Sequence, residues 1–185
     1  MIETTSNLAF STAGTGDAGR IQQLIQSAFR AEDNREGWVA DLALNSRFTV
    51  DIGHIEQTIT QPESDFLIAT DSNGKLVATV GVSKREPGYG RIFMLAVDQR
   101  SQCGGLGREV LTYAEKYCQQ IWGISKLGLD ALSTRQALIS WYRRRGYLPT
   151  QETKPFPREM YPDLALPEDL CFVQFEKEIQ ETIAA

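Results

Sequence analysis

The chain has 185 residues, of which 42% are apolar, and this length and composition are typical of a single domain with one sizeable core. Its formal net charge of −5 argues against broad binding to nucleic-acid phosphates, which requires a basic surface. A single histidine, His54, excludes a multi-histidine metal centre, and three widely spaced cysteines suit neither a zinc site nor a disulfide framework. We therefore expect no metal, and reduced thiols in the cytoplasm.

No apolar run approaches the length that spans a bilayer. The N-terminal segment has no basic residue before Arg20 and no apolar stretch of the kind found in secretory signals. We expect no membrane association, frayed ends at residues 1–7 and 180–185, and either a monomer or a homodimer.

The first third of the chain predicts a strand followed by helices. Residues 8–13 favour the strand, and Asp17 is a plausible N-cap for a helix over Ala18–Arg30, whose apolar residues fall on one face. Residues 38–44 suggest a short helix or an ordered loop. Isoleucines repeat at helical spacing over residues 52–59.

The period then changes to that of strands. Residues 65–69 favour a strand, the sequence DSNG at 71–74 favours a hairpin turn, and residues 75–83 favour the returning strand. Pro87-Gly88 makes another turn before a strand over residues 91–97.

A glycine-rich turn, Gln102-Cys103-Gly104-Gly105-Leu106-Gly107, connects that strand to an amphipathic helix over residues 108–121. Without Cβ atoms, backbone N–H groups can converge on a phosphate, and the helix N-terminus adds the positive end of its dipole. The segment therefore favours an anion site. A glycine cluster by itself is more often an ordinary turn, so the flanking segments are needed to distinguish an anion site from a turn.

The last third predicts a strand over residues 126–131, a helix over 136–145 that Gly146 stops, and a final strand over 171–178. Five of the seven prolines lie between residues 149 and 167. This density prevents a regular helix and forbids a central strand. It predicts a long irregular connection, which is either functional or a surface excursion without a role.

Two blocks carry a family resemblance. The spacing Gln-x-x-Gly-x-Gly after Leu-Ala-Val-Asp resembles the acyl-CoA pyrophosphate loop of the GCN5-related N-acetyltransferase (GNAT) family. The sequence RQALISWYRRRGY at 135–147 resembles the family's final helix, in which a tyrosine, here Tyr142, precedes a glycine-aromatic pair by four residues. Shorter matches look like a subgroup of small microbial acetyltransferases of undefined substrate, and lie at Gly37-Trp38, Arg47, 89–97, Trp141-Tyr142 and 154–157.

The resemblance implies one acyl-CoA N-acyltransferase domain over residues 1–185. Its fold is an α/β (α+β) architecture with a mixed, mostly antiparallel central sheet and helices on both faces. The implied element order is β-α-α-β-β-β-α-β-α-β-β, with adjacent central strands that splay where the coenzyme binds.

The resemblance also implies a reaction, the transfer of an acetyl group from acetyl-CoA to a primary amine by direct attack in a ternary complex. Tyr142 is the expected general acid that protonates the departing thiolate. Backbone groups of Leu95 and Val97 are expected to pair with the pantetheine amides. Arg135 replaces an asparagine common in the family, and it can reach a phosphate or a carbonyl instead. The expected coenzyme contacts are Leu95, Val97, Gln102, Cys103, Gly104, Gly105, Leu106, Gly107, Arg108 and Arg135.

The acceptor is expected between the first two helices and the last β-β connection, beside Trp38, Phe93, Met94 and Phe156. A small-molecule amine is the first choice and a protein N-terminus or lysine the second, because an occluding loop disfavours a polypeptide. A base must deprotonate the amine. The sequence does not identify this base, and the candidates are Glu32, Asp33, Glu36, Glu86 and Asp130.

Two alternatives remain open. Gly105-Leu106-Gly107 partly mimics a dinucleotide-binding fingerprint, with Asp130 at the end of the next strand, as in an NAD(P)-binding oxidoreductase. The third glycine of that fingerprint is replaced by Val110, and the turn after Val97 is too long. The other alternative is a non-catalytic acyl-CoA sensor or interaction module, against which the presence of Tyr142 argues. A P-loop is excluded because no Lys-Ser/Thr follows the glycines.

Overall fold

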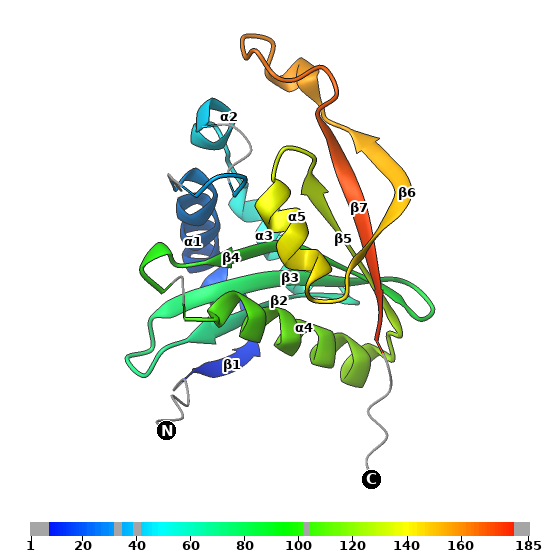
Figure 1. Ribbon diagram of the computed structural model, residues 1–185. Coiled ribbons are helices and arrows are strands. Elements are labelled where there is room, and N and C mark those ends of the chain that lie inside the picture. The colour runs from blue at the N-terminus through cyan, green and yellow to red at the C-terminus, as the bar shows by residue number, and fades with distance from the viewer. Residues whose placement is uncertain (1–7, 32–34, 39–41, 102–103, 180–185) are drawn as a thin grey trace, which may run out of the picture.

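The computed structural model describes residues 8–31, 35–38, 42–101 and 104–179 (Figure 1). The described strands are β1 (Ala9–Thr12), β2 (Ser64–Thr70), β3 (Leu76–Glu86), β4 (Tyr89–Val97), β5 (Lys126–Leu132), β6 (Leu148–Pro155) and β7 (Cys171–Glu178). The described helices are α1 (Ala18–Arg30), α2 (Leu42–Ser46), α3 (Ile52–Thr60), α4 (Leu106–Trp122) and α5 (Gln136–Arg143), with short 3-10 helices η1 (Thr15–Asp17), η2 (Gln99–Ser101) and η3 (Arg158–Met160).

The described strands form one mixed sheet in the order β1-β2-β3-β4-β5-β7-β6. In the part of the chain that the structure describes, β4 and β5 are the only parallel neighbours, and all other pairs are antiparallel. This mixed, mostly antiparallel sheet with helices confirms the predicted fold class.

Helices cover both faces of the sheet (Figure 1). On one face, Ile21 of α1 and Ile55 of α3 pack with Phe66 of β2 in a buried cluster. On the other face, Leu111 of α4 packs with Leu127 of β5 in the largest cluster, which also includes residues of α5. These apolar clusters are the main source of stability, because each removes a helix stripe and a strand face from water.

A bulge interrupts the central strand β4. Its pairing with β3 shifts register so that Met94 and Leu95 lie opposite Val80 alone, and Met94 has a φ of +50°. Consequently Phe93 and Met94, although adjacent, both pack with the α1/α3 cluster, whereas Leu95 packs with the α4/α5 cluster. A positive φ is unusual for a side chain of this size, and such backbone conformations concentrate at functional sites.

Next to the bulge, β4 and β5 separate. Their pairing runs from Tyr89 opposite Lys126 to Arg91 opposite Gly128, and the structure gives no further pair among the described residues. The remaining halves of the two strands diverge (Figure 1), as the resemblance implied. The gap leaves one side of β4 without a strand partner from Ile92 onward.

Two expectations need correction. The implied order has two helices before β2, whereas the described residues form three. The additional helix is α2, which has five residues. The proline-rich segment is not irregular throughout, because its first part forms β6. That strand pairs with β7 alone at the edge of the sheet, where Pro149 and Pro155 need not donate a hydrogen bond. Among the described residues, no helix has the length and apolarity required to cross a bilayer.

Candidate functional site

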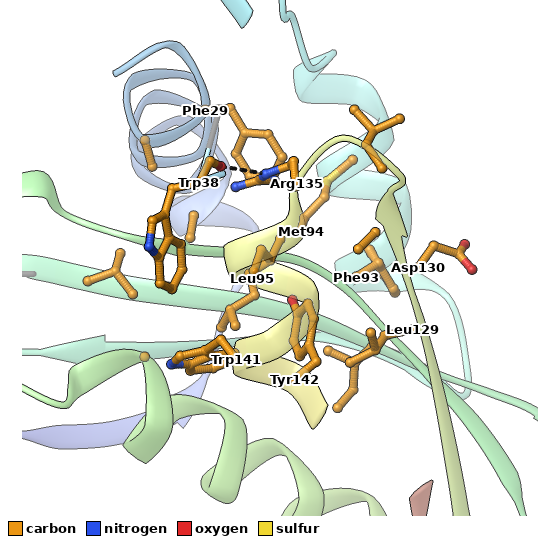
Figure 2. A pocket seen from close by; sticks show the side chains of 18 of the residues that line it. Phe29, Trp38, Phe93, Met94, Leu95, Leu129, Asp130, Arg135, Trp141 and Tyr142 are labelled. Atoms are coloured by element: carbon orange, nitrogen blue, oxygen red, sulfur yellow. Dashed lines mark hydrogen bonds between the residues drawn. The ribbon is translucent and has the colours of Figure 1, made fainter. Parts of the chain in front are cut away.

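A cavity of about 680 Å³ lies where β4 and β5 separate. It is lined by residues of α1, β4, β5 and α5 (Figure 2), by the first turn of α4, and by the connection between β6 and β7. Its size and mixture of apolar and a few polar side chains are typical of small-molecule sites.

The glycine loop forms one end of the cavity. Gly105 precedes α4 with a φ of +82°, which favours glycine, and the first turn of the 17-residue helix follows directly. Gly107 lies against β4 and α5, because a Cβ there would be 3.6 Å from Trp141 and 3.8 Å from Val97. Gly105, Leu106, Gly107 and Arg108 line the cavity, and Gly104 is exposed beside them. The predicted contacts Gln102 and Cys103 lie outside the described residues.

Cations gather at this end. Arg145 lies over the Trp141 ring, 3.8 Å from its centroid, and donates a hydrogen bond to the Trp141 carbonyl. Burial lowers the pKa of Arg145, and the neighbouring Arg144 and Arg108 cations lower it further. A second hollow of about 510 Å³ adjoins the cavity at Arg108 and Arg145. Arg144 also lines it, together with Lys177 and Glu115, which form an ion pair at 2.8 Å. A bound anion would relieve this mutual repulsion.

Tyr142 lies on α5 with its hydroxyl pointing into the cavity (Figure 2). The residue is 6% exposed, and its ring packs edge-on against Trp141 and Tyr147. Burial raises the pKa of Tyr142 to about 12, an effect that the Arg135 cation partly offsets. The phenol is therefore a proton donor throughout the neutral and mildly alkaline range.

Arg135 and the segment at 35–38 join across the mouth of the cavity. Arg135 Nε donates a hydrogen bond to the Trp38 carbonyl at 2.8 Å (Figure 2). The Ala137 amide donates to the Gly37 carbonyl at 3.0 Å. A Cβ on Gly37 would be only 2.9 Å from the Ala137 nitrogen, so this contact requires glycine. Trp38 thus lines the cavity on the side away from Asp130 (Figure 2). The contact of Arg135 with the coenzyme stays a prediction.

The cavity is also lined by the predicted Phe93, Met94 and Phe156 and by residues that the sequence did not indicate. The missed residues are Phe29, Phe48, Arg91, Tyr161 and Phe172. Phe29 was visible only as part of the apolar stripe of α1. The others gave no signal, because they come together from distant parts of the chain.

Among the candidate bases, the structure brings only Asp130 to the cavity wall within the described residues. Its carboxylate points away from Tyr142 (Figure 2) and forms ion pairs with Arg91 at 2.5 Å and with Lys154 at 3.8 Å. Its Oδ1 atom is buried and has no hydrogen-bond partner among the described residues. Burial alone would lower the pKa of Arg91, but hydrogen bonds to Asp130 and Tyr89 raise it. Glu36 and Glu86 are exposed and do not line the cavity. Glu32 and Asp33 lie outside the described residues.

Solved structures of similar fold include the ribosomal-protein-S18-alanine N-acetyltransferase from Escherichia coli, with a TM-score of 0.69 and 18% identity over 96% of this chain and 99% of that chain. A GNAT family acetyltransferase from Elizabethkingia anophelis with acetyl-CoA bound has a TM-score of 0.67 and 13% identity over 94% of this chain and 99% of that one. An acetyltransferase of the GNAT family from Staphylococcus aureus has a TM-score of 0.64 and 14% identity, with the same coverage of both chains. At these identities the likeness shows the fold alone.

Comparison with curated protein sequences gives no match. The family model described as "Acetyltransferase (GNAT) family" matches residues 20–147, which is more than half of the chain and includes α1, the glycine loop and Tyr142. The chain therefore belongs to the GNAT family of acetyltransferases.

Proposed function

We propose that this protein is an N-acetyltransferase that moves the acetyl group of acetyl-CoA to the primary amine of a small molecule. In this proposal residues 1–185 form one acyltransferase domain that works in the cytoplasm without a metal. The observation that carries it is the gap between β4 and β5, which has the α4 N-terminus at one end and the Tyr142 hydroxyl on its wall.

The coenzyme is proposed to lie along this gap. Backbone groups of Leu95 and Val97 lie on the side of β4 that β5 leaves unpaired, and they are suited to the pantetheine amides. The pyrophosphate would bind at residues 104–108, at the N-terminus of α4, where backbone N–H groups and the helix dipole favour an anion. The Arg108 amide itself already donates to the Gly105 carbonyl at 2.9 Å. Arg108 and Arg145 would then hold the phosphates that continue into the second hollow.

In the proposed mechanism the acetyl group passes directly from the coenzyme sulfur to the amine nitrogen, through a tetrahedral intermediate. The neutral amine attacks the thioester carbonyl carbon, a C–N bond forms, and the C–S bond of the tetrahedral intermediate breaks. The Tyr142 hydroxyl donates its proton to the departing sulfur, and the proton lost by the amine nitrogen passes through water to the carboxylate of Asp130. The Arg135 cation, which lowers the pKa of Tyr142, would stabilise the transient phenolate.

Replacing Asp130 by asparagine tests its role as the base. We expect kcat/KM for the amine to fall by roughly 10²-fold, since a positioned base contributes about that much, with little change in the Kd of acetyl-CoA. Raising the pH should restore part of the lost rate, because more of the amine is then already neutral. Glu86→Gln, which removes a carboxylate outside the cavity, is the matched control. Equal rates for Asp130→Asn and the wild type would leave the base unassigned.

Calorimetric titration with acetyl-CoA and with NADH separates the proposal from its alternatives. We expect acetyl-CoA to bind and NADH not to bind. Binding of NADH without acetyl-CoA would overturn the proposal in favour of an oxidoreductase. Binding of acetyl-CoA without release of the CoA thiol in the presence of any amine would point to a sensor instead.

A further inference from the structure

The part of the cavity on the α1/α3 side of the sheet, which we term the acceptor chamber, has two aromatic walls. On one wall, Phe29 of α1 stacks with Phe48 after α2, with ring centroids 4.5 Å apart. On the other wall, Phe156 stacks with Tyr161 at 5.6 Å and contacts Phe172 of β7 at 5.8 Å. The two walls come from opposite ends of the chain, so the chamber exists only in the folded protein.

Phe93 forms a rigid aromatic floor between these walls. Its ring lies directly over Gly81, where a Cβ would be 2.3 Å from the ring, and it meets Phe66 edge-on at 5.8 Å. The bulge in β4 adds Met94 to the same surface. A planar apolar group would thus find aromatic faces on several sides, an arrangement that favours stacking and edge contacts.

The far end of the chamber is closed by contacts between α2 and the connection from β6 to β7. Leu44 of α2 is buried with Phe156, Leu166 and Leu170. Arg47, just after α2, forms a two-bond ion pair with Asp163 of that connection. This boundary on the described part of the chamber favours a short acceptor over a polypeptide.

Most charged side chains on the described cavity wall are cations, namely Arg35, Arg91, Arg108, Arg135 and Arg145. Asp130 is the only acidic side chain on the described cavity wall, and it already pairs with the Arg91 cation. Because its unpartnered oxygen is itself buried, this carboxylate would meet the amino group of the acceptor through water. A second ammonium group would lie against apolar rings and near Arg91, where the loss of its hydration would not be offset.

We propose that the acceptor is a small monoamine whose amino group is attached to an aromatic body, rather than a polyamine, an aminoglycoside or a polypeptide N-terminus. This inference rests on the proposed acetyl transfer. The amino group would lie toward Asp130, and the aromatic body would lie between the Phe29–Phe48 wall and the Phe156 wall.

The test measures CoA thiol release with a matched set of amines, 2-phenylethylamine, hexylamine, spermidine and a tetrapeptide with a free N-terminus. We expect kcat/KM for 2-phenylethylamine to exceed the values for spermidine and for the peptide by at least about a hundredfold. Spermidine would place a second charge against the aromatic rings, and the peptide would place polar backbone groups there. We expect kcat/KM for 2-phenylethylamine to exceed that for hexylamine by about tenfold, the contribution of aromatic contacts beyond apolar burial.

Phe156→Leu and Phe48→Leu should each remove most of the preference for 2-phenylethylamine over hexylamine. The Kd of acetyl-CoA should stay unchanged in both variants, which would also show that they fold. Phe10→Leu is the matched control, since Phe10 stacks with Tyr113 outside the cavity. Preferred transfer to spermidine or to the peptide, or an unchanged preference in both chamber variants, would overturn the inference alone. Failure of acetyl-CoA to bind the wild type would overturn the proposed function and the inference with it.

Discussion

Replacing Tyr142 by phenylalanine is expected to lower kcat for acetyl transfer by roughly 10²- to 10³-fold, the usual contribution of a positioned general acid. The Kd of acetyl-CoA should stay nearly unchanged, because the hydroxyl acts only when charge develops on sulfur. The ring that packs against Trp141 and Tyr147 is kept, so folding should be preserved. Single-turnover kinetics at saturating acetyl-CoA, with calorimetry for the Kd, would measure both effects.

Tyr113→Phe is the matched control, because it removes a tyrosine hydroxyl from α4 outside the cavity and should leave kcat intact. The pH dependence gives a second test. Since burial raises the pKa of Tyr142 to about 12, the acid form persists above the usual range of a phenol, and activity that depends on it is lost only as the pH rises through that value. We therefore expect that ionisation of Tyr142 does not lower kcat at any pH up to 10. Unaltered turnover in Tyr142→Phe would assign the residue to packing.

Replacing Gly107 by phenylalanine is expected to weaken acetyl-CoA binding by roughly a hundredfold, through the loss of charge-assisted hydrogen bonds to the phosphates. Gly107 lines the cavity and faces Trp141 and Val97 at ordinary contact distances for a Cβ, so a large side chain has to enter the space proposed for the coenzyme. Calorimetric titration would give the Kd, and thermal unfolding would show that α4 is retained.

Gly107→Ala is the graded comparison, because its single added carbon fits beside Trp141 and Val97 without overlap. It should bind acetyl-CoA almost as tightly as the wild type. Gly16→Ala, at an open position in η1, controls for the general effect of replacing glycine. Normal acetyl-CoA binding by Gly107→Phe would mean that the phosphates bind elsewhere.

Local sequence signals predicted most of the elements, because they depend on neighbouring residues. The apolar period of α1, the hairpin turn at 71–74 and the glycine at position 146 each report a local backbone preference. The glycine loop before α4 was also evident from the sequence, since Gly105 adopts the positive φ that such a turn requires. Tyr142 was found by its spacing within a recognisable block, and α5 then places it on the cavity wall.

Tertiary structure alone decided the rest of the candidate site. The bulge at Met94 depends on how β4 pairs with β3, and it places Phe93 and Met94 on one face against the alternation that their sequence suggests. The sequence did not distinguish Asp130 from the other candidate carboxylates. Only the pairing of β4 with β5 shows that Asp130 lies beside Arg91. The two aromatic walls likewise come from segments that are more than a hundred positions apart in the chain, at Phe29–Phe48 and Phe156–Phe172. A local pattern encodes which backbone conformation a segment prefers, whereas register and long-range packing determine which side chains meet.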